Sequence, residues 1–208
     1  MELTLLIDTA FEACQVALAQ GDKILAQQVQ TGGGGQDRLL AGMVRDVLHA
    51  QNITVKNLGK IAVTTGPGRF TGLRVGIAFA RGLALVHKTP LVGLVTTDIL
   101  ALDLADAAPD KNNLAVVLSV KRGEAFVQRV KPMPTDIERV MDPDLNDYLM
   151  KSGPVTVGGF IAPATRALFG PEVSVMDGLE APSLTHMAGL AALTNALPNV
   201  PVRPYYGA

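Results

Sequence analysis

Apolar and polar positions divide the first half of the chain into short runs of strand length and longer stretches with helical spacing. The runs predict strands at Leu3–Asp8, Cys14–Ala19, Lys23–Val29, Ile61–Thr65 and Leu91–Val95. Residues recurring every three or four positions predict helices at Gln36–Ala50, Thr71–His87 and Thr97–Ala107. Gln20-Gly21-Asp22 has turn composition, so the second and third strands should form a hairpin. Strands followed by alternating helices and strands predict a mixed sheet with packed helices.

The second half also begins with strands, after a polar boundary at Pro109–Asn113. The pattern there predicts a hairpin of Leu114–Val120 and Glu124–Lys131, turning at Lys121-Arg122-Gly123. Short strands near Val155 and Val173 and three helices follow, at Asp142–Met150, Ala162–Leu168 and Ser183–Leu197. We therefore expect an α/β protein of two lobes, 1–107 and 108–208, each a mixed sheet with helices, the second abbreviated.

Composition narrows the class of protein. The chain has 208 residues, of which 48% are hydrophobic and 18% charged, the balance of a compact globular protein. Its 18 basic and 19 acidic residues are scattered, so RNA binding by the chain alone is not expected. The longest apolar run, Leu73–Val86, contains Arg74 and Arg81 and is shorter than the roughly 20 residues that span a bilayer. With no signal peptide pattern either, we expect a cytoplasmic protein without membrane segments.

Candidate chemistry is sparse. Asp8 and Thr9 follow the first strand and Glu12 is close behind, so these three are candidates to lie near a nucleotide. The alternative is that Asp8 caps the strand end. The single cysteine, Cys14, allows no intramolecular disulfide, and the three histidines are not at metal-ligand spacing. No catalytic residue, metal or cofactor is predicted.

The stretch Gly66-Pro67-Gly68-Arg69-Phe70-Thr71-Gly72 joins a strand to a helix, with Thr71 as the expected N-cap. Free amides at a helix start attract anions, so a phosphate is one interpretation. A sharp turn that needs glycine is the other. The stretch is not a Walker loop, because no Gly-Lys-Ser/Thr follows.

The helix Thr71–His87 is apolar on nearly all sides, which predicts burial on two faces. Gly72, Gly76, Ala80 and Ala84 form a stripe of small residues that would let another helix approach, either the chain's own helix Gln36–Ala50 or a helix of a partner subunit. We expect this helix and Gln36–Ala50 to form the face that docks a partner subunit. The predicted interface residues are Leu39, Leu40, Met43, Val47, Phe70, Thr71, Gly72, Leu73, Arg74, Gly76, Ile77 and Ala80.

The run Gly66–Gly76 resembles the signature of the TsaB (YeaZ) family, where a Gly-Pro-Gly-Ser-Phe-Thr-Gly motif opens the second helix. The similarity extends to Ile7-Asp8-Thr9, Glu12-Ala13-Cys14, Arg81–Leu85 and Leu91–Thr97. It covers residues 1 to about 107. Arg69 stands where the family has Ser, and the glycine run Gly32–Gly35 is a second departure.

The resemblance implies the actin-like ATPase (ribonuclease H-like) fold. It also implies a non-catalytic subunit of the complex that makes N6-threonylcarbamoyladenosine in tRNA, with the catalytic subunit TsaD and the ATPase TsaE as partners and tRNA contacted indirectly. TsaD carries a His-x-x-x-His metal motif where this chain has Thr97 and Ala101. A hydroxyl and a methyl group do not replace two imidazoles, which favours the supporting role.

Three alternatives stay open. A nucleotide-dependent small-molecule kinase of the same fold would use Gly158-Gly159-Phe160 near an adenine. A protease-like enzyme is disfavoured, because no Ser/His/Asp or metal constellation is present. A stand-alone homodimeric interaction protein would pair through the two apolar helices, as the chain itself could when its partner is absent.

Overall fold

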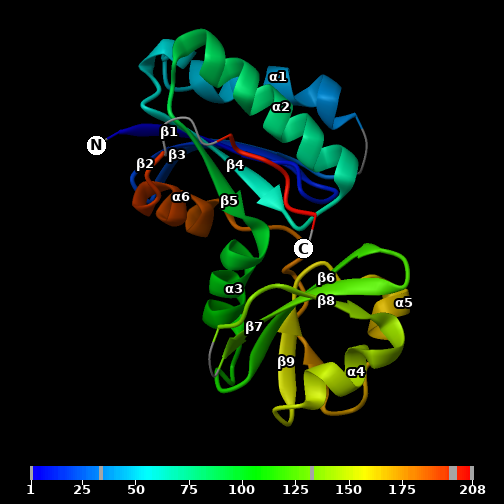
Figure 1. Cartoon of the computed structure of the whole chain (residues 1–208). Coiled ribbons are helices and arrows are strands. Elements are labelled where there is room, and N and C mark those ends of the chain that lie inside the picture. The colour runs from blue at the N-terminus through cyan, green and yellow to red at the C-terminus, as the bar shows by residue number, and fades with distance from the viewer. Residues whose placement is uncertain (1, 33–34, 132–133, 197–200, 207–208) are drawn as a thin grey trace. The chain divides into compact units, whose positions relative to one another are not determined.

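The computed structural model describes residues 2–32, 35–131, 134–196 and 201–206. Its contacts form two compact units. The first unit comprises Met1–Thr96 and Pro182–Tyr205, and the second comprises Thr97–Ala181 and Tyr206–Ala208. Figure 1 shows the helices and strands of both.

The first unit contains a five-stranded sheet in the order β3-β2-β1-β4-β5. Its strands are β1 (Leu3–Asp8), β2 (Cys14–Gln20), β3 (Lys23–Gln30), β4 (Lys60–Gly66) and β5 (Leu91–Val95). β1, β2 and β3 pair antiparallel, whereas β1, β4 and β5 run parallel. β4 is buried along its whole length, as expected of a central strand covered on both faces.

Helices cover both faces of this sheet. α1 (Gln36–His49) and α2 (Phe70–His87) lie on one face, and α6 (Leu184–Leu193) lies on the other (Figure 1). The apolar side of α1 is buried through residues at helical spacing, namely Leu40, Met43, Val44, Val47 and Leu48. A 3₁₀ turn at Val55–Asn57 leads into β4.

The second unit repeats the topology of the first. Its sheet has the order β10-β9-β6-β7-β8, with β6 central, antiparallel to β7 and parallel to β9. The strands are β6 (Leu114–Lys121), β7 (Glu124–Lys131), β8 (Glu138–Met141), β9 (Val155–Gly158) and β10 (Val173–Val175). The strand senses match as well, since β7 and β8 are antiparallel and β9 and β10 parallel. The predicted two-sheet α/β fold class is therefore confirmed.

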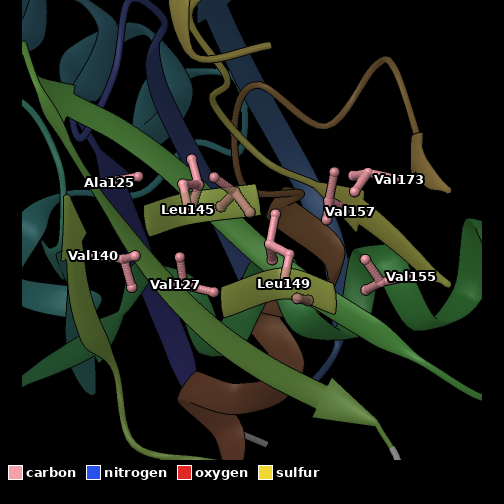
Figure 2. Close-up of a cluster of buried hydrophobic side chains, with 10 residues drawn as sticks. Ala125, Val127, Val140, Leu145, Leu149, Val155, Val157 and Val173 are labelled. Atoms are coloured by element: carbon pink, nitrogen blue, oxygen red, sulfur yellow. The ribbon is translucent and has the colours of Figure 1, made fainter. Parts of the chain in front are cut away.

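The helices of the second unit are α3 (Thr96–Ala107), α4 (Asp142–Met150) and the single turn α5 (Pro163–Arg166). Leu145 and Leu149 of α4 are fully buried against the sheet, as Figure 2 shows. The strand residues facing them alternate along the chain, among them Val127, Val155 and Val157. On the opposite face, the backbone of Gly158 lies against Leu104 of α3.

The division into units differs from the predicted lobes, 1–107 and 108–208. After the last strand of the first sheet, α3 belongs from Thr97 onward to the second unit. After the last strand of the second sheet, α6 packs on the first sheet through Leu184, Met187, Ala188 and Ala191. Each sheet thus gains a layer from a helix that follows the other sheet in sequence.

Most predicted elements are confirmed, including both hairpins. Thr71 is not the N-cap of α2, because the extended residue before the helix is Arg69 and its side chain makes no capping bond. The short strand β8 was not predicted, and α6 ends at Leu193. Part of the glycine run Gly32–Gly35 lies outside the described residues.

Candidate functional site

The carboxyl end of β1 is built around Asp8, which is fully buried. One carboxylate oxygen accepts from the amide of Ala10 at 3.0 Å and from the hydroxyl of Thr64 at 2.7 Å. The other oxygen accepts from Nε2 of Gln15 at 3.0 Å. Burial raises the pKa of the Asp8 carboxyl above its usual value of 3.8, and these hydrogen bonds offset part of the effect. Asp8 therefore joins strand ends inside the unit, as the strand-capping alternative predicts.

Thr9 and Glu12 do not join Asp8 at a common ligand position. The hydroxyl of Thr9 is buried and donates to the carbonyl of Gly72 at 2.8 Å. Glu12 is exposed, and its carboxylate lies 3.4 Å from the guanidinium of Arg69. Asp8 thus joins the ends of strands, whereas Thr9 and Glu12 connect the segment after β1 to the start of α2.

The thiol of Cys14 is also an internal group. Cys14 is buried, and burial together with the nearby Asp8 raises the pKa of the thiol to about 11. The neutral thiol is a poor nucleophile, so Cys14 acts as a small core residue.

The loop before α2 is fixed by backbone hydrogen bonds on both sides. The amide of Arg69 donates to the carbonyl of Ala10 at 2.7 Å, and the amide of Gly66 donates to the hydroxyl of Thr96 at 3.1 Å. The amide of Tyr205 donates to the carbonyl of Thr65 at 2.7 Å, so the C-terminal segment docks here. Gly66 has a φ of +106°, which favours glycine. These contacts support the sharp turn rather than a phosphate cradle.

Two-thirds of the predicted interface residues are buried in their own unit. A Cβ atom at Gly72 would overlap the carbonyl of Thr9, and one at Gly76 would overlap the hydroxyl of Thr9. Gly72 and Gly76 therefore allow α2 to approach Thr9, directly after β1, so these two positions face the chain's own unit rather than a partner helix. The buried members are Leu40, Met43, Val47, Gly72, Leu73, Gly76, Ile77 and Ala80.

The remaining predicted residues are exposed. They are Leu39, Phe70, Thr71 and Arg74, of which Phe70 retains 53% of its surface. Exposed residues that the sequence analysis missed extend this surface along α2: Ala78, Arg81, Gly82, Leu85 and Val86. Leu85 and Val86 are 81% and 74% exposed, which is unusual for large apolar side chains.

The exposed residues of α2 follow a regular helical spacing. We define the α2 outer stripe as Thr71, Arg74, Ala78, Arg81 and Leu85, which recur at intervals of three and four. Such spacing places side chains on one side of a helix and is typical of helix–helix contacts. Counting three and four positions in both directions from Arg74 would have identified the stripe from the sequence alone.

The positions considered for a kinase or metal site have other surroundings. Gly158 and Gly159 face Leu104 and the carbonyl of Val117 within the second unit. Among the residues that the structure describes, no three His, Cys, Asp or Glu side chains lie together as metal ligands. In the same part of the chain, no helix is long and apolar enough to cross a membrane.

Residues 37–148 match the family model described as TsaD, tRNA N6-adenosine threonylcarbamoyltransferase. The chain belongs to the TsaD family. Its curated relatives include proteins named tRNA threonylcarbamoyladenosine biosynthesis protein TsaB, which confirm the predicted resemblance to the TsaB (YeaZ) family. The Escherichia coli protein is 35% identical over 125 residues, covering 59% of this chain and 52% of the relative. The Haemophilus influenzae protein is 30% identical over 134 residues, covering 62% of this chain and 54% of the relative.

Solved structures show the same fold. A Pseudomonas aeruginosa protein described as similar to peptidase YeaZ superposes with a TM-score of 0.81 over 99% of both chains, at 21% identity. YeaZ from the same organism gives a TM-score of 0.74 over 93% of this chain and 92% of its own, at 20% identity. The chain spans about half the length of the curated relatives it matches, 52% and 54% of the two TsaB proteins.

Proposed function

We propose that this chain is a non-catalytic subunit of the complex that makes N6-threonylcarbamoyladenosine in tRNA. In this role it binds the TsaD catalytic subunit and works with the ATPase TsaE, and it meets tRNA indirectly through the complex. The TsaB names of its relatives and the signature before α2 support this role. Because its partners act on tRNA, we place it in the cytoplasm.

The observation that carries the proposal is the internal use of the polar groups at the end of β1. Asp8 accepts three hydrogen bonds from its own unit, and the hydroxyl of Thr9 is bound to Gly72. Catalytic groups need access to the reacting atoms. Residues that hold strand and helix ends in this way favour a supporting role over a kinase-like one.

The docking face in this proposal is the exposed side of α1 and α2. Leu39, Phe70, Leu85 and Val86 expose apolar surface there. Exposed apolar groups of this size commonly mark contacts with other proteins. The buried residues of the predicted interface support the surface from below and do not touch the partner.

The test is a tRNA modification assay with the TsaD subunit and TsaE from the same cell, omitting one component at a time. We expect activity to require this chain, and this chain alone to turn over no nucleotide. Full activity without it, or nucleotide turnover by the isolated chain, would overturn the proposal, and turnover would favour the kinase alternative.

A pair of variants locates the docking face. Ala78→Arg places a long charged side chain at an exposed position of α2, so pairing with TsaD should be lost while the fold is kept. Ala164→Arg makes the same change at an exposed position of α5 and should bind normally. Equal binding by both variants would remove α2 from the interface.

A further inference from the structure

We propose that Gln36 is a positioning residue of the docking face, because it binds the start of α1 to the same loop that holds the start of α2. This inference rests on the proposed function, in which that face binds the TsaD subunit. The loop connects β1 to β2 and comprises residues 9–13, and we call it the 9–13 loop.

The 9–13 loop is mostly buried, although connecting segments usually run over the protein surface. Four of its five residues are buried, namely Thr9, Ala10, Phe11 and Ala13, whereas Glu12 is exposed. Buried backbone groups need hydrogen-bond partners. Several of the partners of this loop lie at the starts of α1 and α2, so the loop connects the two helices.

Backbone groups connect the 9–13 loop to α2. The hydroxyl of Thr9 donates to the carbonyl of Gly72 at 2.8 Å, and the amide of Arg69 donates to the carbonyl of Ala10 at 2.7 Å. Both contacts lie within three residues of the exposed Phe70, at the start of the helix. The first turn of α2 is thus held in place through its own main chain.

A side chain connects the same loop to α1. Gln36 is the first residue of the helix, and its Nε2 donates to the carbonyl of Phe11 at 2.9 Å and to that of Ala13 at 3.2 Å. The amide group has two hydrogens, so both are used. Gly35 precedes the helix with a φ of +74° and has no side chain that could cap it. The start of α1 therefore depends on Gln36.

The two helices also meet at this point. α1 and α2 lie side by side on one face of the sheet (Figure 1). A Cβ atom at Gly72 would come within 3.0 Å of Oε1 of Gln36, so the glycine leaves room for this oxygen. The exposed Leu39 lies in the same helical turn as Gln36. Without the hydrogen bonds of Gln36, that turn would be released while Phe70 on α2 stays in place.

The position requires a hydrogen-bond donor. Both partners of Gln36 are carbonyl oxygens, which only accept. A carboxylate has nearly the same shape as the amide but offers no donor when ionised, and a thioether leaves both carbonyls unpaired. A face whose two edges are already ordered pays less conformational entropy when the partner binds. The donor at position 36 should therefore affect binding to TsaD.

The experiment compares Gln36→Met with Gln51→Met in the full chain. Gln51 also donates from Nε2 to a backbone carbonyl, that of Leu25 at 3.2 Å, but it is exposed and lies after α1. Calorimetry measures binding to the TsaD subunit from the same cell. We expect Gln36→Met to weaken binding about tenfold, as for a face that is correctly arranged about a tenth of the time. Gln51→Met should bind within about twofold of the wild type.

Hydrogen exchange of the isolated chain reports on the start of α1 directly. The amides of Arg38 and Leu39 donate to the carbonyl of Gly35 at 2.9 and 3.0 Å. Gln36→Met should speed their exchange, because the turn opens more often. Gln51→Met should leave both amides unchanged.

Two further variants separate the donor from the size of the side chain. Gln36→Lys keeps a donor, and Lys60 already donates to two carbonyls in this unit, so binding should stay within about threefold of the wild type. Gln36→Glu keeps the size but not the donor, and should weaken binding at least as much as Gln36→Met. Equal binding by Gln36→Lys and Gln36→Glu would overturn the requirement for a donor.

The proposed function and the role of Gln36 can fail separately. If the wild-type chain does not bind TsaD, the proposed function fails, while hydrogen exchange still tests whether Gln36 secures α1. If the wild type binds and Gln36→Met binds as tightly as Gln51→Met, the positioning role is overturned and the proposed function stands. If Gln36→Met does not fold, Gln36→Asn, which keeps the amide on a shorter side chain, replaces it with Gln51→Asn as control, and a smaller loss in the same order is expected.

Discussion

In each sheet, one segment connects the fourth strand to the fifth in chain order. The two segments have the same place in the topology, but their lengths differ greatly. Between β4 and β5 the chain forms α2, with 18 residues, whereas between β9 and β10 it forms α5, with four. α2 buries Gly72, Leu73, Gly76, Ile77 and Ala80 on one side and exposes the outer stripe on the other. α5 buries Thr165. One topology thus carries a two-sided helix in the first unit and a single turn in the second.

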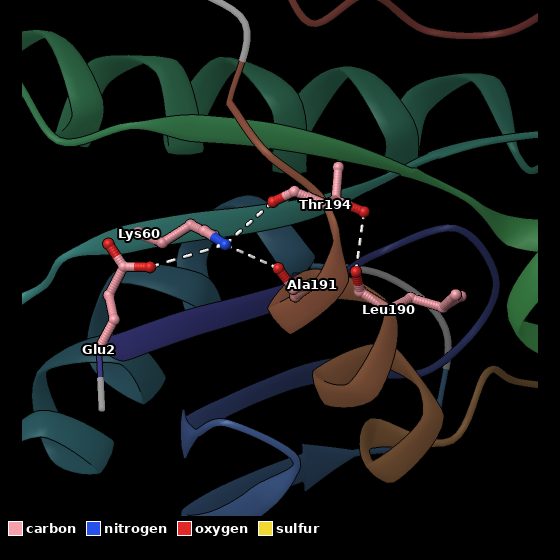
Figure 3. A network of polar contacts seen from close by, with 5 residues as sticks. All are labelled: Glu2, Lys60, Leu190, Ala191 and Thr194. Atoms are coloured by element: carbon pink, nitrogen blue, oxygen red, sulfur yellow. Dashed lines mark hydrogen bonds and ion pairs between the residues drawn. The ribbon is translucent and has the colours of Figure 1, made fainter.

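In both units, a buried basic side chain on a strand donates hydrogen bonds to carbonyls at the end of a helix. Lys60 of β4 is buried, and its ammonium donates to the carbonyls of Ala191 and Thr194 at 2.8 and 2.9 Å, as Figure 3 shows. Arg129 of β7 is buried and donates to the carbonyls of Tyr148 and Leu149 at 2.7 and 2.8 Å. Carbonyls at a helix end lack intrahelical partners and favour a cation, so each unit secures one helix from a strand.

The largest expected effect concerns the buried side of α2. Gly72→Val should lower the free energy of unfolding by about 3 kcal/mol or more, because the added side chain meets the backbone of Thr9. Chemical denaturation measures the loss. Gly82→Ala is the control on the exposed side, where no atom lies within 4 Å of the new Cβ. It should be neutral or stabilise by up to about 1 kcal/mol, and a large loss there would mean that the two sides are wrongly assigned.

In the second unit, the corresponding substitution affects the contact of α4 with the sheet. Leu149→Ala should cost about 2–5 kcal/mol, because it leaves a cavity in the cluster shown in Figure 2. Hydrogen exchange should show the loss of protection first in β7 and β9. Leu168→Ala, at a site already 39% exposed, is the matched change and should cost far less.

The buried cations should have intermediate effects. Lys60→Met leaves the two carbonyls at the end of α6 without their donor and should cost about 1–3 kcal/mol. Arg129→Met should cost more, because Arg129 also donates to the partly buried Asn113 at 3.3 Å, whereas the further partner of Lys60 is the exposed carboxylate of Glu2 at 3.6 Å. Thermal unfolding measures both, with Lys23→Met at an exposed position of β3 as the control. Losses no larger than that of the control would show that neither cation secures its helix.

The smallest effect is a dependence on pH with opposite signs in the two units. The folded-state pKa of Asp8 is raised by burial, so the folded state binds more protons than the unfolded state, and this contribution to stability falls as pH rises above about 4. Asp8→Asn removes the titration, so its stability relative to wild type should increase over that range.

Asp177 of the second unit provides the opposite case. Its hydrogen bond and ion pair with Arg166 lower the pKa of its carboxyl. The resulting stability is present above the unfolded-state pKa and is lost as pH falls. Asp177→Asn should therefore lose stability relative to wild type as pH rises, by a small amount because the pair is exposed. Parallel pH profiles for the two variants, from denaturation at several pH values, would contradict the assigned pKa directions.

The sequence by itself determined most of the strands, the amphipathic helices, the two-sheet α/β class and the family resemblance. These depend on local periodicity and on the motif Gly66–Gly76, both of which are written in consecutive residues. Periodicity shows which side of an element is buried, but not what it is buried against. The outward side of α2, which carries Arg74 and Arg81, could therefore have been predicted from the sequence.

Tertiary structure alone decided the rest. Gly72 and Gly76 are small because Thr9 lies against them, and a glycine facing a strand has the same sequence signature as one facing a partner helix. Likewise, α6 is an apolar helix near the C-terminus, and its packing on the first sheet depends on contacts with residues more than a hundred positions away, such as Lys60. Contacts between distant segments depend on the whole arrangement of the chain, so no local pattern encodes them.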